Sequence, residues 1–341
     1  MNQIKYFTLL TFLLITAGCN GQKKPGASVS VKSDSVKTVI ADSVILENDS
    51  IGENSIESLK NQIKQQQSFL DSLNAALSKY KSRNITVRNE LNYFKRNIDN
   101  LIRYNKSFGW RVEFLGKMYD AYIVDIDAVN VKIFHRDNKG KNHSFQTIAS
   151  QAQSIGGDLA FAMNAGMFTP QKNPQGLYIE NGKEKYKMDT KKSGYGNFYM
   201  QFKKNNPDFG LSNGVFLISL QKGAHIIYPD SIHSFDKKQV TLATQSGPLM
   251  MKDGVFNEHF NQSSKNLNIR NGVGIINSKK VVFVISNEPV NFYEFSQLFR
   301  DFFQCKDALY LDGVISQIYA PELGAMQSTG SGFGPILGVI R

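Results

Sequence analysis

The feature that most constrains this chain is a seven-residue repeat of apolar side chains between residues 56 and 101. Eleven of the fourteen a and d positions of the heptad are apolar, or twelve when a tyrosine is counted. A repeat sustained over this length predicts a long α-helix with a coiled-coil seam, about 70 Å long at 1.5 Å per residue. The a and d positions are Ile56, Leu59, Ile63, Gln66, Leu70, Leu73, Leu77, Tyr80, Asn84, Val87, Leu91, Phe94, Ile98 and Leu101.

The polar residues of this repeat leave its oligomeric state open. Asn84 at an a position would fix the register of a coiled coil, whereas Arg83 facing Arg88 would repel. We expect a helical stalk at residues 55–105, with homo-oligomerisation through residues 56–101 as one outcome. The alternatives are a single amphipathic helix and a helical hairpin broken near Asn84, lying against the domain that follows.

The first 19 residues have the composition of a secretory signal peptide. Lys5 precedes an apolar run at residues 6–15, which is too short to cross about 30 Å of hydrocarbon and is followed by small residues and Cys19. Residues 14–19 resemble a bacterial lipobox, whose cysteine becomes the lipidated first residue of the mature chain. This predicts a lipoprotein anchored through Cys19 to the bacterial cell envelope, on its periplasmic or cell-surface side. An ordinary signal peptide with an incidental cysteine is the alternative.

A change of composition separates the signal from the stalk. Residues 20–54 are rich in Ser, Asp, Lys, Val and Gly and show no sustained period. This composition predicts a flexible tether, with a few short strands as the alternative. The expected organisation is therefore a signal peptide at 1–19, a tether at 20–54, a stalk at 55–105 and one domain at 106–341.

Composition also limits the classes of function. With 41% hydrophobic residues in a chain of 341, there is enough apolar mass for one large domain. The 40 Lys and Arg against 29 Asp and Glu suit acidic partners such as phosphates, anionic envelope polymers or lipid head groups. Basic and aromatic residues are not interleaved in a nucleic-acid-binding signature, so we expect no nucleic-acid partner.

Cysteine and histidine usage argues against disulfide and metal frameworks. Two cysteines, Cys19 and Cys305, cannot build a disulfide scaffold. The five histidines include no pair at a metal-binding spacing. We therefore expect no metal site and no cofactor. A calcium ion held by carboxylates and carbonyls is left open, because such sites need no fixed spacing.

From residue 108 the pattern changes to short apolar stretches separated by turn signals. Two segments, 145–155 and 292–303, have helical spacing. Because strands outnumber helices, we expect an α+β fold with a mixed, largely antiparallel sheet, preceded by the long heptad-repeat helix. The first two strands are expected to pair with each other. The expected strands are 119–126, 129–134, 159–163, a hairpin at 176–188, 197–203, 214–220, 240–244, 249–255, a hairpin at 273–286, 308–311 and 336–340.

Polar residues recur where these apolar strands begin or end, each beside glycine-bearing backbone. Asn164, Gln245 and Asp312 each follow a strand, and Arg270 precedes one. Each such sequence by itself is common in ordinary turns. Together they predict one cleft at a sheet edge where an acid, a guanidinium and amides meet, with glycines that let backbone approach a ligand.

Residues 108–341 resemble the phosphodiester glycosidase family, named for the lysosomal uncovering enzyme that removes N-acetylglucosamine from a phosphate-linked mannose. The resemblance implies the fold and the site residues, whereas the substrate stays open. Val314 departs from the wider family, which usually has a second glycine there. Residues 286–295 and 311–313 resemble a bacterial lipoprotein subgroup of the family. The motifs that carry the resemblance by their order and spacing are 164–168, 176–182, 245–248, 270–274, 312–316 and 334–335.

Cleavage of a sugar–phosphate bond needs a carboxylate for the oxocarbenium-like carbon and a cation for the departing phosphate. We expect Asp312 to be that carboxylate, as nucleophile or as base for water, and Arg270 to clamp the phosphate. Asn164 is the third expected catalytic residue. Glu180 and Glu288 are candidates for a second carboxylate, and retention or inversion is left open. The expected substrate-binding residues are Gly166, Glu180, Gln245, Ser246, Glu288, Gly313 and Ser316.

Each of these residues also has a structural alternative, such as an Asp-Gly turn for Asp312, an ion pair for Arg270 and a capping role for Ser316. The functional expectation is an extracytoplasmic glycoside hydrolase that cleaves a glycosyl-phosphate or related glycosidic linkage in an envelope or extracellular glycan. The alternative is a non-catalytic module that binds anionic glycans and is held off the membrane by the stalk. Val314 favours that alternative, because a β-branched residue tolerates positive φ poorly and narrows a cleft. A scaffold that acts through the heptad helix is a third interpretation.

Overall fold

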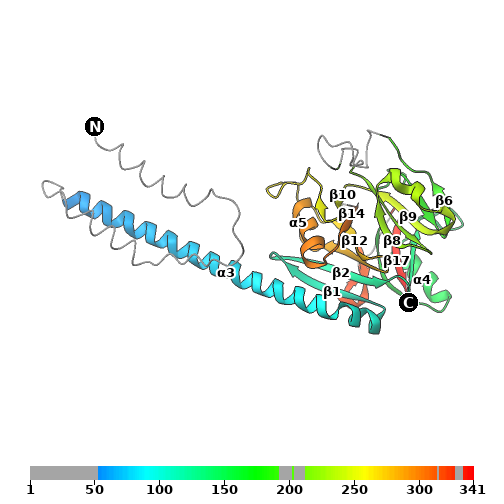
Figure 1. The fold of residues 1–341 in the computed structure, drawn as a ribbon, viewed down its shortest axis with the longest axis horizontal. Helices are drawn as coiled ribbons and strands as arrows, with labels where there is room; N and C mark the ends of the chain where they lie inside the picture. Colours follow the sequence, from blue (N-terminus) through cyan, green and yellow to red (C-terminus); the bar gives the residue numbers. More distant parts are fainter. Residues whose placement is uncertain (1–52, 192–201, 203–211, 313–314, 327–332) are drawn as a thin grey trace. The chain divides into compact units, whose positions relative to one another are not determined.

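A computed structural model describes residues 53–191, 202, 212–312, 315–326 and 333–341 (Figure 1). The expected signal peptide, the lipidation site Cys19, nearly all of the tether, most of the strand expected at 197–203, and Gly313 with Val314 lie outside these residues. The chain divides into two units, Met1–Ala75 and Ala76–Arg341. All of the described β-strands belong to the second unit.

The helix α3 spans Glu53–Asn105, the segment in which the sequence predicts a stalk. Its described apolar heptad side chains from Leu59 to Tyr80 are between 49% and 60% exposed in the single chain. Side chains this exposed are available to a partner helix, but a single chain does not test that pairing. The coiled coil therefore stays a prediction. Within the described parts of the chain, no helix combines the length and the apolar character needed to cross a bilayer.

The second unit is built on three antiparallel sheets. Sheet I has seven strands in the order β1-β2-β13-β12-β14-β10-β11. Every strand pair described in it is antiparallel. The bounds are β1 Ser107–Phe114, β2 Lys117–Asp125, β10 Leu249–Lys252, β11 Val255–Phe256, β12 Asn271–Asn277, β13 Lys280–Ser286 and β14 Asp307–Asp312.

Sheets II and III each have five strands, in the orders β16-β15-β4-β17-β3 and β6-β5-β9-β7-β8. Their described pairings are also antiparallel, so the expected α+β fold with largely antiparallel sheet is confirmed. In sheet II the bounds are β3 Asn130–Phe134, β4 Leu159–Asn164, β15 Ile318–Ala320, β16 Ala325–Met326 and β17 Ile336–Ile340. In sheet III they are β5 Tyr178–Glu180, β6 Lys183–Tyr186, β7 Gly214–Ser219, β8 Gly223–Ile227 and β9 Val240–Ser246.

The inner faces of the three sheets share one apolar core. Strand β13 shows how the sequence achieves this, because Val281, Phe283 and Ile285 face that core while Val282 and Val284 face a second cluster on the outer side of sheet I. A strand covered on both faces needs a continuous apolar run, which explains the sequence KVVFVIS.

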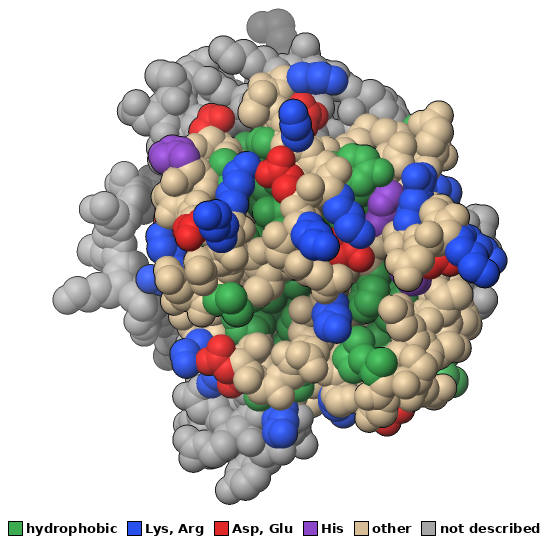
Figure 2. Space-filling view, turned by 90° about the vertical axis from the view of Figure 1, so that its right-hand side faces the viewer, with side chains coloured by type: hydrophobic (Ala, Val, Ile, Leu, Met, Phe, Trp, Pro, Cys, Tyr) green, Lys and Arg blue, Asp and Glu red, His purple; other side chains and the backbone are tan. Residues whose placement is uncertain are grey.

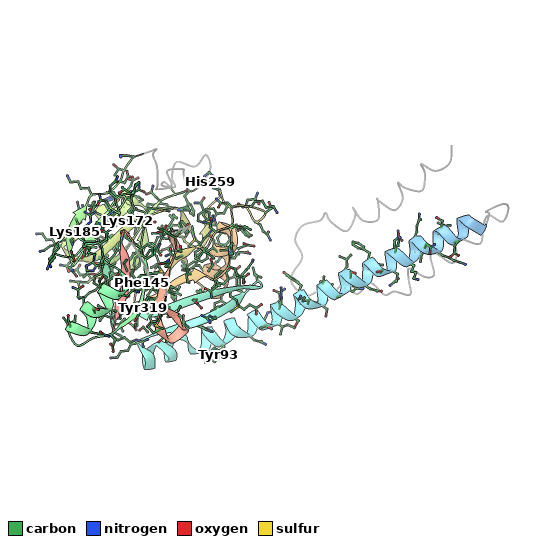
Figure 3. The ribbon with its side chains drawn as sticks, turned by 180° about the vertical axis from the view of Figure 1, so that it is seen from behind. Tyr93, Phe145, Lys172, Lys185, His259 and Tyr319 are labelled. Atoms are coloured by element: carbon green, nitrogen blue, oxygen red, sulfur yellow. The ribbon has the colours of Figure 1, made fainter. Side chains whose placement is uncertain are left out.

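Two helices cover the outer faces of the sheets. Helix α5, Phe292–Gln297, continues into a π-helical turn, Leu298–Phe302, and packs on sheet I. Helix α4, Phe145–Ser154, covers sheet II and begins with a capping box between Ser144 and Thr147. Phe145 contacts Tyr319 of β15 with ring centroids 6.3 Å apart (Figure 3).

Several expected elements are corrected by the structure. Strands β2 and β3 do not pair with each other: β2 lies between β1 and β13 in sheet I, whereas β3 pairs with β17 at the edge of sheet II. The strands β1, β8, β15 and β16 were not expected, and the helix expected at 292–303 is divided into α5 and the π-helical turn. Strands β8, β15 and β16 have only five, three and two residues, so their sequences carry little period-2 signal. Strand β1 is different, because Phe108, Trp110, Val112 and Phe114 alternate with polar residues or glycine, a period-2 signal that was missed.

Candidate active site

One transverse row of residues crosses sheet I on its inner face. Arg111 of β1 lies opposite Asp120 of β2, which lies opposite Ile285 of β13. Ile285 lies opposite Asn271 of β12, which lies opposite Asp312 of β14. Directly opposed residues of neighbouring strands share a face, so this transverse row carries two carboxylates, a guanidinium and an amide. Its five Cα atoms span four interstrand spacings, about 19 Å.

A bulge turns Asp312 into this row. Leu309 and Leu311 face the inner core, so strict alternation along β14 would send Asp312 to the outer face with Tyr310. The register shifts between Asn271 and Gly272, where Asn271 opposes Asp312 and Gly272 opposes Tyr310. An extra residue in one strand re-aims the side chain that follows it. Asp312 therefore faces the same side as Asn271.

Asn164, Asn271 and Asp312 form a hydrogen-bonded group that we call the strand-end cluster. The Asn271 Nδ2 donates to the Asn164 backbone oxygen at 2.9 Å and to Asn164 Oδ1 at 2.8 Å, while its Oδ1 accepts from the Asp312 N–H at 2.7 Å. The Asn164 Nδ2 in turn donates to Asp312 Oδ2. Asn164 and Asn271 are fully buried and Asp312 is 7% exposed. The cluster holds one carboxylate in a single orientation.

Sequence reasoning identified two members of this cluster and missed Asn271. The missed residue lies in the motif 270–274, directly after the residue that was chosen instead. The signal that marks it resembles the one that marked Asn164, a polar residue at one end of an apolar strand and close to a glycine. Ser316 also reaches the cluster, because its hydroxyl donates to the Asp312 backbone oxygen at 3.0 Å. That contact is the local capping bond that the sequence offered as an alternative.

A cleft of about 540 Å³ runs along part of the transverse row. Arg111, Asp120 and Ile285 line it on the sheet I side, and Ser316 with Ile318 line it near the strand-end cluster. It combines apolar walls with convergent polar groups, which is the usual composition of a small-molecule site. We take this cleft and the strand-end cluster together as the candidate active site.

Asp120 and Arg111 form a two-point ion pair inside this cleft. The Arg111 Nε donates to Asp120 Oδ1 at 2.7 Å and its Nη2 donates to Asp120 Oδ2 at 3.1 Å. The hydrogen bond and charge of Asp120 raise the pKa of the guanidinium. Asp120 is 3% exposed, and neither residue was expected in the site. The available signal was an acid at the second position of the apolar strand expected at 119–126.

Arg270 does not contact Asp312, contrary to expectation. Its Nε donates to the Val290 backbone oxygen at 2.8 Å, its Nη2 donates to the Asn266 backbone oxygen at 2.8 Å, and its guanidinium lies 3.6 Å from the centre of the Phe292 ring. Within the described residues, no carboxylate lies within 4.0 Å of this guanidinium. Burial lowers the pKa of Arg270. Its contacts belong to the outer side of sheet I, away from the cluster.

Gln245 and Ser246 are engaged by the protein itself. The Gln245 Oε1 accepts from the backbone N–H groups of Leu177 and Asp189, each at 2.9 Å, and its Nε2 donates to Asp189 O at 2.8 Å and to Asn213 Oδ1 at 3.1 Å. Ser246 donates to the Leu311 backbone oxygen at 2.9 Å. Both side chains therefore hold neighbouring strand ends in place. A sugar hydroxyl that bound to either side chain would have to replace one of these hydrogen bonds.

Gly166 has a packing reason to be glycine. Its φ is 133°, which side-chain-bearing residues rarely adopt, and a Cβ there would meet Thr244 Oγ1 at 2.5 Å. The Thr244 hydroxyl donates to the Ala165 backbone oxygen at 2.6 Å. The close approach at Gly166 is thus to strand β9, and its role in ligand binding stays a prediction.

The two candidates for a second carboxylate lie apart from the strand-end cluster. Glu180 of β5 accepts from Lys185 at 2.8 Å and from the Tyr178 hydroxyl at 3.1 Å. Glu288 accepts from Lys117 at 3.4 Å and from the Met118 N–H at 3.2 Å. Neither is described in contact with Asp312, and the expected Gly313 lies outside the described residues. The second acid in the transverse row is Asp120 instead.

Two further observations bear on ligands. In the described parts of the chain, no three His, Cys, Asp or Glu side chains are arranged to hold a metal ion.

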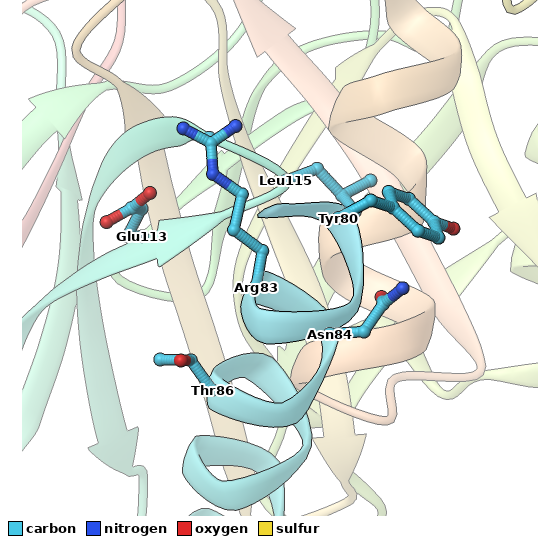
Figure 4. A pocket seen from close by; sticks show the side chains of 7 residues that line it. Tyr80, Arg83, Asn84, Thr86, Glu113 and Leu115 are labelled. Atoms are coloured by element: carbon cyan, nitrogen blue, oxygen red, sulfur yellow. The ribbon is translucent and has the colours of Figure 1, made fainter. Parts of the chain in front are cut away.

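A separate cavity of about 250 Å³ contains none of the expected site residues (Figure 4). It is lined by Tyr80, Arg83, Asn84, Thr86, Glu113, Leu115 and Gly116. It lacks a carboxylate pair or an amide cluster, so it offers no second candidate for catalysis.

A profile of the phosphodiester glycosidase family matches residues 157–327. The chain belongs to the phosphodiester glycosidase family. The matched segment contains all three residues of the strand-end cluster. The cluster is therefore part of the phosphodiester glycosidase domain itself, whereas Arg111 and Asp120 precede the matched segment.

Known proteins resemble the chain to different degrees. YigE of Escherichia coli strain K12, described as an uncharacterized protein, is 32% identical over 201 residues, which cover 58% of this chain and 73% of that protein. The catalytic domain of zebrafish N-acetylglucosamine-1-phosphodiester alpha-N-acetylglucosaminidase, solved as auto-inhibited by its pro-peptide, is 16% identical with a TM-score of 0.45, covering 68% of this chain and 81% of that one. A putative exported protein from Burkholderia pseudomallei K96243 is 8% identical with a TM-score of 0.40, covering 66% and 74%. The phosphodiester glycosidase assignment rests on the family profile.

Proposed function

We propose that this protein is an extracytoplasmic hydrolase that cleaves a glycosyl-phosphate or related glycosidic linkage in an envelope or extracellular glycan. The observation that carries the proposal is the strand-end cluster, in which Asn164 and Asn271 orient the Asp312 carboxylate. The cluster is joined to the cleft through Ser316, which lines the cleft and donates to the Asp312 backbone oxygen. Membership of the phosphodiester glycosidase family supports a glycosidase-type reaction. The sugar and the aglycone are not part of the proposal.

Asp312 is the proposed catalytic residue. Cleavage at an anomeric carbon passes through an oxocarbenium-like state, which a carboxylate stabilises either as nucleophile or as base for water. A departing phosphate is weakly basic, so the reaction needs less help from a general acid than the cleavage of an ordinary glycoside does. A carboxylate held in one orientation by amide donors is suited to this role, because it does not have to reorient when the reaction takes place.

Arg270 is left out of the proposed machinery, because its guanidinium is enclosed on the other side of sheet I. Arg111 is the described guanidinium that lines the cleft. It lies at the opposite end of the transverse row from Asp312, about 19 Å away between Cα atoms. We therefore assign Arg111 to binding the glycan at a distance from the reacting carbon.

The test uses the full chain and a glycosyl phosphodiester. The Asp312→Asn variant keeps an acceptor oxygen for Asn164, so it should fold with a nearly unchanged Tm while sugar release falls by about 100-fold or more. The matched control is Asp307→Asn on the same strand, where the carboxylate pairs with Lys252 at 3.0 Å far from the cluster. Sugar release by Asp312→Asn at the wild-type rate would refute the proposal.

A second candidate function is supported by the 7% exposure of Asp312, which leaves little carboxylate surface for a reacting sugar. In that case the cleft binds an anionic glycan without turnover. Calorimetry that detects a sugar phosphate bound to the full chain, together with mass spectrometry that finds no product after long incubation, would favour this second function.

The proposed location rests on sequence features, of which Cys19 and nearly all of the tether lie outside the described residues. Cys19 would carry the lipid anchor, residues 20–54 would form the tether and residues 55–105 the stalk that holds the domain away from the membrane. The domain would then lie outside the cytoplasm, where it can reach envelope glycans.

A further inference from the structure

A second cleft, of about 450 Å³, lies outside the candidate active site. It is formed by strand β3, the loop that leads into α4, and the β5–β6 hairpin. Lys and Arg side chains are spread over the face of the domain shown in Figure 2. The charged residues that line this basic cleft are Lys132, Arg136, Asp137, Lys141, Glu180 and Lys185.

The two acids of the basic cleft are already engaged. Glu180 pairs with Lys185 at 2.8 Å. Asp137 accepts hydrogen bonds from the backbone N–H groups of Lys139 at 2.8 Å and Lys141 at 2.9 Å, and these bonds lower the pKa of its carboxyl. Both carboxylates therefore have donors within the protein, which limits their repulsion of an incoming anion.

Three cations of the basic cleft have no carboxylate partner among the described residues. The Arg136 Nε donates to Asn142 Oδ1 at 2.9 Å and its Nη2 donates to the Gln171 backbone oxygen at 3.1 Å, and both partners are neutral. For Lys132 and Lys141, no described carboxylate lies within 4.0 Å. Their positive charges converge on one concave surface, which favours an anion over a neutral ligand.

The basic cleft lies at the same level of sheet II as the strand-end cluster. Asn164 of β4 lies directly opposite Ile336 of β17, which lies opposite Phe134 of β3. Opposed residues share a face, and Lys132 is two residues before Phe134 on that face. Phe134 is therefore two interstrand spacings, about 10 Å, from Asn164. Ile336 is fully buried, so a glycan that is held at Asp312 and reaches these cations has to pass around this row rather than across it.

We propose that the basic cleft is a subsite for a second phosphate group of the glycan, away from the linkage that is cleaved. Lysine and arginine form charge-assisted hydrogen bonds with phosphate oxygens, and the cleft is concave enough to enclose such a group. The substrate class is then a glycan with more than one phosphate. The identity of the ligand as substrate rests on the proposed function, whereas phosphate binding by the cleft does not.

The first experiment measures binding of inorganic phosphate to the full chain by calorimetry at low ionic strength. The double variant Lys132→Gln, Lys141→Gln should bind phosphate with about tenfold lower affinity. The control Lys265→Gln, Lys279→Gln removes the same charge from exposed positions elsewhere and should bind as the wild type does. Equal affinity of the two double variants would overturn the subsite.

The second experiment separates this inference from the proposed function. Asp312→Asn should bind phosphate like the wild type, even though its sugar release is strongly reduced. In the active protein, a glycosyl phosphodiester with a second phosphate should have a higher kcat/KM than one with a single phosphate. That preference should disappear in Lys132→Gln, Lys141→Gln. If the wild type hydrolyses neither compound, the proposed hydrolysis fails and the calorimetric comparison alone decides the subsite. A preference that survives in the double lysine variant would overturn the subsite.

Discussion

Asn271 lies directly opposite Asp312 in the pairing of β12 with β14, and its side-chain amide joins the Asp312 backbone to Asn164. One amide therefore sets the position of two strand ends that come from different sheets. It contacts no reacting group in the proposed mechanism, so it is a positioning residue. Loss of the Asn271 amide should therefore lower both the stability of the fold and the rate of sugar release.

Replacing Asn271 by Ala leaves the Asp312 N–H and the Asn164 Oδ1 without this partner in a buried place. At about 1–3 kcal/mol for each group, we expect the free energy of unfolding to fall by about 2–4 kcal/mol. Denaturant titration measures the loss. The control Asn277→Ala removes an amide from the turn at the other end of the same strand and should cost far less. Equal effects of the two variants would contradict the positioning role.

Arg270→Lys tests whether the guanidinium is structural. The substitution removes the Nε and Nη2 hydrogen bonds and the planar stack on Phe292, so we expect a loss of about 2 kcal/mol in the free energy of unfolding. The folded variant should keep the wild-type KM for a glycosyl phosphodiester. A raised KM with an unchanged Tm would restore Arg270 as the phosphate clamp.

The stability of the domain should fall as the pH drops through the ordinary pKa of histidine. Burial lowers the pKa of His135, whose Nε2 lies 2.7 Å from the Lys172 backbone oxygen. Below about pH 6.5 this histidine therefore takes up a proton more readily in the unfolded chain than in the folded chain. The contribution of neutral His135 to the free energy of unfolding is then complete above that pH and is lost as the pH falls below it. Tm measured from pH 7.5 down to 5.5 should fall less steeply in His135→Gln, while the exposed-site control His233→Gln should follow the wild type. Parallel Tm curves for all three proteins would contradict this origin.

Self-association through α3 is a separate prediction. Leu70 and Leu77 occupy a positions and are 50% and 49% exposed in the single chain. If the heptad seam pairs two chains, sedimentation of the full chain should show an oligomer, and Leu70→Asp with Leu77→Asp should give a monomer. The control Ser68→Asp with Ala75→Asp adds the same charge at f positions and should stay oligomeric. A wild-type chain that sediments as a monomer would rule out the seam.

Lipid attachment at Cys19 is tested in bacteria that express the full chain. The wild type should incorporate labelled fatty acid and partition into detergent, and Cys19→Ala should lose both properties. Cys305→Ala is the control, because Cys305 is a core residue that is only 2% exposed. An unlabelled wild type would show that the signal peptide is of the ordinary kind.

Individual strands and helices were predicted well where the residues of the element itself show a clear apolar pattern. The segments that became β4, β7, β12 and β13 have apolar runs bounded by turn residues, and the capped helix α4 begins at the expected residue. Pairing was less predictable, because β3 finds its partner in β17, about 200 residues later in the chain. Which distant strand fills an edge depends on the packing of all three sheets, and no local pattern encodes it.

The candidate site shows the same division. The sequence alone determined that Asn164 and Asp312 stand at strand ends within the phosphodiester glycosidase motifs, and the structure brings them into contact. Only the tertiary structure decided that Asn271, and not the adjacent Arg270, faces them. The reason is that side chains alternate across a sheet, so a neighbour in sequence points to the other face. A one-residue bulge in β14 reverses that alternation at Asp312, and a bulge is defined only by the register between strands.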